Sequence, residues 1–157
     1  MNRRSFLSRL AALPAALAAG PALSGRAAAR DLPKLVVAKT PTCGCCGAWV
    51  ERMQAAGFTV EAHDVTQEAL NQIKAQLGVP QPLHSCHTGQ IDSYFIEGHI
   101  PAEDIKRLIA ERPDGVGIAA PGMPAGSPGM EMGAMRDSYQ TLLLRPDGSV
   151  DVFARHG

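Results

Sequence analysis

The sequence has no apolar run long enough to cross a bilayer, no excess of basic residues and no serine-hydrolase or phosphate-loop motif. Its longest apolar stretch, residues 10–23, is interrupted by proline and glycine and is shorter than the roughly 20 residues that a transmembrane helix needs. Acidic and basic residues are equal in number, so the chain lacks the basic face that nucleic acid binding requires. No Ser-His-Asp grouping, phosphate loop or paired-carboxylate pattern stands out above chance spacing. We therefore expect neither a membrane-spanning protein nor a nucleic-acid partner.

The first 29 residues have the pattern of a signal peptide. Arg3 and Arg4 precede a run of Ala and Leu, which ends in the small residues Ala27, Ala28 and Ala29. The arginine pair resembles a twin-arginine signal, which exports folded proteins, and an ordinary Sec signal is the alternative. We expect residues 1–29 to be removed, leaving residues 30–157 as one exported domain. All fifteen acidic residues but only eleven of the fifteen basic ones lie in that part, so it carries a net charge of −4.

The exported part predicts strands that alternate with helices. Strands are expected at residues 35–38, 58–65, 88–92 and 94–97, and helices at 47–56, 67–77 and from Pro101 onwards. This order, with a cysteine motif between the first strand and the first helix, is typical of a thioredoxin-like domain in the α/β class.

The C-terminal third begins with a segment rich in Gly, Pro and Met. Residues 113–138 contain six glycines and four prolines and show no periodic apolar pattern, which predicts a long loop without helix or strand. Residues 139–144 and 149–154 are separated by the turn sequence RPDG, so they predict a β-hairpin at the end of the chain.

Three of the four cysteines lie within four residues, at Cys43, Cys45 and Cys46. Cys43 and Cys46 have the C-x-x-C spacing of a reversible disulfide, and a helix N-terminus at this point favours the thiolate. A dithiol enzyme does not need Cys45, and a bond between the adjacent Cys45 and Cys46 would be strained. Two structural disulfides are an alternative in an oxidising compartment, although a bridge inside this segment would close almost no chain.

The fourth cysteine, Cys86, stands beside His87 in the loop before the third expected strand. In thioredoxin-like folds this loop faces the cysteine motif, and redox members of the fold place a cis-proline there. Here Cys86 and His87 take that place. Three or four thiolates at one helix end suit a soft metal, Cu(I) before Zn(II). Because the thiols of the CGCC segment are crowded for one tetrahedral zinc ion, a small multinuclear Cu(I) cluster is favoured.

Methionine is concentrated in the Gly/Pro-rich segment, at Met123, Met130, Met132 and Met135. Thioether sulfur selects Cu(I) over Zn(II), so a methionine-bearing arm would sharpen a preference for copper. The alternative is that these side chains fill gaps between the loop and the domain.

Five histidines offer further ligands. His87 is the best candidate because it adjoins Cys86, whereas His84 and His63 are weaker candidates near the same edge. We expect His99 to be a turn residue before the third helix, and His156 to be a tail residue without an identified partner.

The segments TCGCCGAW, SCHTG, EGHIPAEDI and PGMPAGSPGME together resemble the CopG-like copper-resistance family. These are exported thioredoxin-fold metal-binding proteins, long classified as a domain of unknown function. The resemblance runs from about Leu35 to the C-terminus. It implies a periplasmic copper-binding protein for copper resistance and homeostasis, whose partners are copper ions and other periplasmic copper-handling proteins.

The resemblance also implies which residues hold copper. In the family, the CxCC segment and the CH pair are linked with a multinuclear site; the corresponding residues here are Cys43, Cys45, Cys46, Cys86 and His87. The family pattern adds Met123 and Met130 as methionine ligands. A role in interconverting Cu(I) and Cu(II) has been proposed for the family, which makes a copper oxidoreductase one reading.

The leading hypothesis is therefore a protein that holds Cu(I) in a thiolate-rich cluster and changes its oxidation state. A thiol-disulfide oxidoreductase that uses Cys43 and Cys46 is the rival enzyme, and a non-catalytic domain with two disulfides is the third reading.

Overall fold

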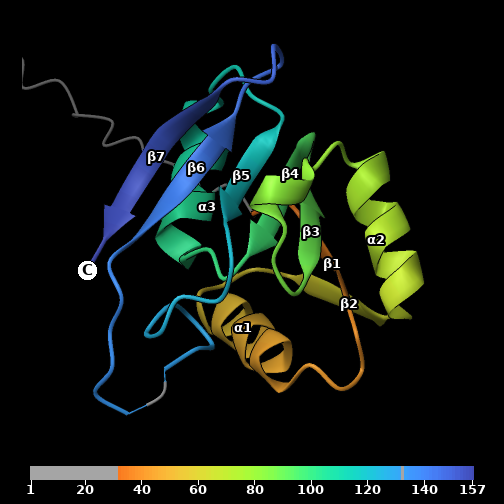
Figure 1. Cartoon of the computed structure of the whole chain (residues 1–157), viewed down its shortest axis with the longest axis vertical. Helices are drawn as coiled ribbons and strands as arrows, with labels where there is room; N and C mark the ends of the chain where they lie inside the picture. Colours follow the sequence, from red (N-terminus) through yellow and green to blue (C-terminus); the bar gives the residue numbers. More distant parts are fainter. Residues whose placement is uncertain (1–31, 132) are drawn as a thin grey trace, which may run out of the picture. The chain divides into compact units, whose positions relative to one another are not determined.

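The computed structural model describes residues 32–131 and 133–157, in which three α-helices accompany one seven-stranded sheet (Figure 1). The predicted signal peptide and Met132 lie outside the described residues. In chain order the elements are β1 (Leu35–Lys39), α1 (Gly44–Ala55), β2 (Val60–Asp64), α2 (Gln67–Gln76), the short 3-10 helix η1 (Gln81–Leu83), β3 (Thr88–Ile91), β4 (Tyr94–Gly98), α3 (Ala102–Glu111), β5 (Gly117–Ala120), β6 (Tyr139–Leu144) and β7 (Val150–His156).

The strands follow the order β2-β1-β3-β4-β5-β6-β7 across the sheet. The pairs β1/β2 and β4/β5 are parallel, and the other neighbours are antiparallel. The fold is therefore mixed α/β. None of the described helices combines the length and the apolar character needed to span a membrane.

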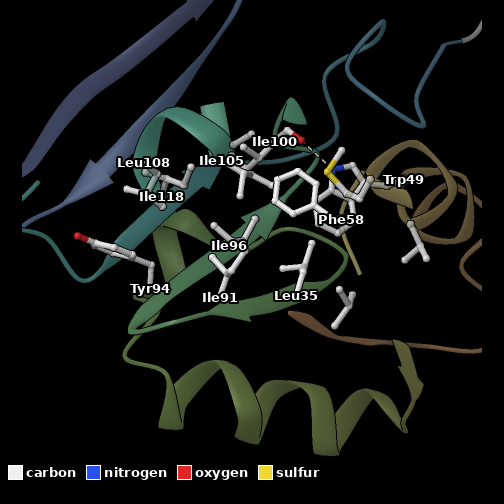
Figure 2. Close-up of a cluster of buried hydrophobic side chains, with 14 of the residues drawn as sticks. Leu35, Trp49, Phe58, Ile91, Tyr94, Ile96, Ile100, Ile105, Leu108 and Ile118 are labelled. Carbon is white, nitrogen blue, oxygen red and sulfur yellow. Dashed lines mark hydrogen bonds between the residues drawn. The ribbon is translucent and has the colours of Figure 1, made fainter. Parts of the chain in front are cut away.

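Helices α1 and α3 cover one face of the sheet. Figure 2 shows Trp49 of α1 and Ile105 and Leu108 of α3 converging on strand side chains such as Ile96. The Trp49 indole also donates a hydrogen bond of 2.8 Å to the Ile100 carbonyl. Because alternate strand residues point to opposite faces, Phe95 joins a second apolar cluster on the other side, which includes the chain just after α2.

Local signals explain two of the helix ends. Thr66 caps α2 by accepting a hydrogen bond from the Ala69 backbone N–H. Gly57, which follows α1, has φ +96, a conformation that favours glycine. Helix α1 begins at Gly44, three residues earlier than predicted, so Cys45 and Cys46 lie in its first turn.

The prediction that residues 113–138 lack a strand is wrong, because Gly117–Ala120 form β5. All four of its residues are buried, so the strand shows no alternation of apolar and polar residues. Gly117 lies so close to β4 that a Cβ atom there would be 2.4 Å from the Phe95 side chain. Strand β5 connects the C-terminal hairpin to the sheet, and Figure 1 shows β6 and β7 continuing the sheet beyond it.

Candidate metal centre

The sheet brings the two cysteine segments together. Strands β1 and β3 are antiparallel neighbours in which Ala38 pairs with Thr88. The end of β1 and the start of β3 therefore lie next to each other, at the same end of the two strands. The chain after β1 leads into the cysteines of α1, and the chain before β3 carries Cys86 and His87.

The four cysteine sulfur atoms all lie within 4.8 Å of one another. Cys43 and Cys46 are joined by a disulfide, whereas Cys45 and Cys86 are free. The Cys45 Sγ lies 3.5 Å from the Cys43 Sγ and 4.0 Å from the Cys86 Sγ. Reduction of the disulfide would therefore leave four thiols on one small patch.

Two imidazoles adjoin Cys86 on the buried side of this cluster. The His87 ring is fully buried beside the Trp49 indole, and its Nδ1 lies 3.5 Å from the Cys86 Sγ. The His87 Nε2 has no hydrogen-bond partner among the described residues, which is costly for a buried polar atom. The His99 Nε2 lies 3.0 Å from the Cys86 Sγ.

A hydrogen bond fixes the orientation of the His99 ring. Its Nδ1 lies 2.8 Å from the Pro128 carbonyl oxygen, which can only accept, so Nδ1 carries the proton. The lone pair of Nε2 therefore faces Cys86. Ligating histidines in metalloproteins are oriented in this way by a partner on the second ring nitrogen.

His99 lies in the bend between β4 and α3, as predicted, but it also belongs to a group of possible metal ligands, which was not anticipated from the sequence. A signal for its position was present in the expected hairpin of β3 and β4. Thr88 pairs with Glu97, and the Gly98 N–H donates to the His87 carbonyl, so His99 follows directly on the residue opposite His87. Counting residue pairs outward from the turn of the β3/β4 hairpin would have placed His87 and His99 side by side.

The other histidines lie elsewhere. His63 is exposed, with its Nε2 2.9 Å from a Glu61 carboxylate oxygen. His84 has its Nε2 3.1 Å from the Val79 carbonyl. His156, expected to be a tail residue without an identified partner, has its Nε2 2.9 Å from an Asp104 carboxylate oxygen.

Part of the Gly/Pro-rich segment packs on the centre. A Cβ atom on Gly129 would lie 2.7 Å from both the Cys45 carbonyl oxygen and the Trp49 nitrogen, so this glycine rests on the first turns of α1. Met130 follows it and is half-buried, whereas Met123 is 54% exposed. Met135 is also exposed, so Met130 is the least exposed of these three methionines.

Burial favours the uncharged forms of Cys86, His87 and His99. It raises the pKa of the Cys86 thiol to about 12, with a further contribution from Cys45. Burial also lowers the pKa of His87, helped by His99, and lowers the pKa of His99. The imidazoles are thus neutral at physiological pH, which is the form that binds metals.

This donor set fits a thiophilic metal ion. Sulfur and imidazole nitrogen suit copper and zinc, whereas Mg²⁺ and Ca²⁺ need oxygen ligands. Cys86, His87 and His99 form a second group of ligand atoms within 4.8 Å of one another, and this group shares Cys86 with the cysteine cluster. The unpartnered His87 Nε2 is a buried nitrogen that a metal ion could satisfy.

The chain is similar to proteins of known structure. Residues 83–130 match a family described as "Protein of unknown function, DUF411". No curated protein matches the sequence. Form 1 of the copper resistance protein CopG is 46% identical, with a TM-score of 0.74 over 80% of this chain and 98% of that one. Form 2 is 44% identical, with a TM-score of 0.75 over 80% and 99%. The chain therefore belongs to the CopG family of copper resistance proteins.

Proposed function

We propose that this protein is an exported, periplasmic copper-binding protein that contributes to copper resistance by holding Cu(I) at the cysteine and histidine centre. The observation that carries the proposal is the gathering of four cysteine sulfur atoms within 4.8 Å of one another. The signal-like leader with its arginine pair supports export. The names of the two related structures support copper rather than zinc.

The proposed ligands extend the set that the sequence indicated. Thiolates come from Cys43, Cys45, Cys46 and Cys86, and His87 supplies a nitrogen. We add His99, because its free lone pair faces Cys86. Met123 and Met130 are proposed as thioether ligands on the segment that packs over α1.

A multinuclear cluster is the proposed form of the bound copper. Thiolate sulfur can bridge metal ions, and sulfur atoms 3.5 and 4.0 Å apart leave little room for four separate mononuclear sites. Because the Cys43–Cys46 disulfide withholds two thiolates, full loading requires its reduction.

We propose a thioredoxin-like core for the part of the chain that carries the site. A C-x-x-C pair at the start of α1 follows β1, and parallel β1/β2 and antiparallel β3/β4 belong to one sheet. The described residues contain no cis peptide bond, and Cys86 and His87 stand in the loop before β3. Redox members of thioredoxin-like folds place a cis-proline in this loop. Its replacement by Cys86 and His87 favours metal binding over exchange of substrate disulfides.

The disulfide supports a proposed redox reaction. Two Cu(II) ions would each accept one electron from the dithiolate of Cys43 and Cys46, giving two Cu(I) ions and one disulfide. The protein would then convert Cu(II) into Cu(I), and the donors left to hold the product would be Cys45, Cys86 and the imidazoles beside Cys86. Anaerobic addition of Cu(II) to the reduced protein, followed by thiol counting, tests this reaction: one disulfide should appear for every two Cu(I) ions formed, and unchanged thiols would disprove it.

The first experiment is an anaerobic titration of the reduced protein with Cu(I) against a chromophoric chelator. We expect more than one tightly held ion per chain, and a lower stoichiometry after Cys45→Ser. Ser93→Ala, in the β3/β4 turn away from the cysteines, is the control and should bind like the wild type. Weak or no binding by the wild-type protein would disprove the copper proposal.

The rival function is disulfide exchange by Cys43 and Cys46, which the observed disulfide allows. It predicts catalytic reduction of a model disulfide by a protein that lacks both Cys45 and Cys86. Absence of turnover in that double variant would remove the rival.

A further inference from the structure

A buried ion pair lies beneath the loop that carries Cys86. Lys74 of α2 and Glu97 of β4 have side chains that are 1% and 0% exposed, and the Lys74 Nζ lies 2.5 Å from the Glu97 Oε1. The same carboxylate oxygen accepts a hydrogen bond of 2.5 Å from the backbone N–H of Ser85. Ser85 directly precedes Cys86, so one buried carboxylate joins α2, β4 and the cysteine loop.

Ser85 is held from two more sides. Its hydroxyl donates to the Gly122 carbonyl in the segment that leads to the Gly129 contact. Gly98, with φ +77, lies so close that a Cβ atom there would be 2.6 Å from the Ser85 side chain. The Gly98 N–H also donates to the His87 carbonyl. The backbone on each side of Cys86 is thus attached to the end of β4.

A contribution to the stability of the fold does not by itself explain why an ion pair is buried here. Removing two charges from water costs free energy that a buried pair seldom recovers, and apolar side chains of similar size often stabilise such a site equally well. The Glu97 Oε2 has no hydrogen-bond partner among the described residues, so its desolvation is incompletely offset. One helical turn before Lys74, the same buried face of α2 carries Leu70, an ordinary core residue.

We propose that Glu97 and Lys74 are positioning residues of the metal centre. Glu97 holds the Ser85 backbone so that the Cys86 sulfur faces both Cys45 and His99. Lys74 fixes that carboxylate and places a buried positive charge under a site that becomes negative when several thiolates bind Cu(I). This inference rests on the proposed copper-binding function.

The test compares the full-length variants Glu97→Ala, Glu97→Gln and Lys74→Met with Leu70→Ala. The last variant removes a buried core side chain from α2 and leaves the residues that bond to Glu97 unchanged. Cu(I) affinity is measured by chelator competition below the melting temperature of each variant. The rate at which iodoacetamide alkylates Cys86 in the metal-free protein is followed by peptide mass spectrometry.

We expect Glu97→Ala to weaken Cu(I) binding about 10- to 100-fold, the usual effect of removing a group that orients a ligand. Glu97→Gln retains an acceptor for Ser85 but loses its charge, so its loss should be about tenfold, the lower end of that range, and Lys74→Met should resemble it. All three should change the Cys86 alkylation rate. Leu70→Ala should lower the melting temperature and leave both readouts unchanged.

Two results would overturn the inference: wild-type affinity and alkylation in the Glu97 variants, or equal losses in Leu70→Ala. If Glu97→Ala does not fold, Glu97→Gln and Lys74→Met decide the matter. If the wild-type protein binds no Cu(I), the proposed function fails, and the alkylation rates alone decide whether Glu97 and Lys74 position Cys86.

Discussion

Replacing Gly129 with alanine should detach the Gly/Pro-rich segment from the metal centre. Gly129 has φ +83, and an L-residue in this conformation costs about 1–2 kcal/mol. The added Cβ atom would also lie 2.7 Å from the Cys45 oxygen and the Trp49 nitrogen. Both are backbone atoms of α1 that cannot rotate away, and overpacking of this kind costs about 1–3 kcal/mol.

Gly148 supplies a matched control for this substitution. It has φ +85, and its Cβ position has no heavy atom within 4 Å, so Gly148→Ala has the backbone penalty without the clash. Urea unfolding should show a loss of about 1–2 kcal/mol for Gly148→Ala. Gly129→Ala should lose more, or should relieve the clash by lifting the segment off α1. In either case its Cu(I) affinity should fall below that of the control in the chelator competition. Equal Cu(I) affinities for the two variants would refute the contribution of this segment to the site.

Two further predictions concern single side chains. His99→Ala should weaken Cu(I) binding at least about tenfold because it removes the proposed nitrogen ligand beside Cys86. His63→Ala removes an exposed imidazole and should leave the affinity unchanged. Equal affinities for the two variants would exclude His99 as a ligand. Lys74→Met should lower the free energy of unfolding by about 3–5 kcal/mol, measured with urea, because it leaves the buried Glu97 carboxylate without its cation. A loss below about 1 kcal/mol, typical of an exposed pair, would contradict that account.

Much of the fold was predictable because its signals are local. The Thr66 cap fixed the start of α2, and the hairpin turn before Tyr94 fixed the pairing of β3 with β4. Strand β5 was missed because its identity depends on burial between β4 and β6, which are distant in the sequence. Four small or apolar residues in a glycine-rich context carry no period that could reveal such a strand.

The candidate metal centre also combines features that are visible in the sequence with features that depend on the folded structure. The clustering of Cys43, Cys45 and Cys46 is visible in the sequence, and the fold expectation brought Cys86 to them. His99 required the exact hairpin register. The contact of Gly129 with α1 could not be predicted, because it depends on the path of a segment without helix or strand.

If copper binds as proposed, the disulfide links copper binding to the redox state of the protein. With Cys43 and Cys46 joined, two thiols and the two imidazoles next to Cys86 are the cysteine and histidine donors that remain in the described cluster. Reduction adds two thiolates, so the reduced protein should bind Cu(I) more tightly than the oxidised protein. By linkage, Cu(I) must stabilise the dithiol to the same extent and raise its midpoint potential, by about 30 mV for each tenfold difference in affinity. Equilibration with a thiol buffer, with and without Cu(I), measures this shift. An unchanged potential would mean that the two cysteines are not copper ligands and that the disulfide is independent of the metal centre.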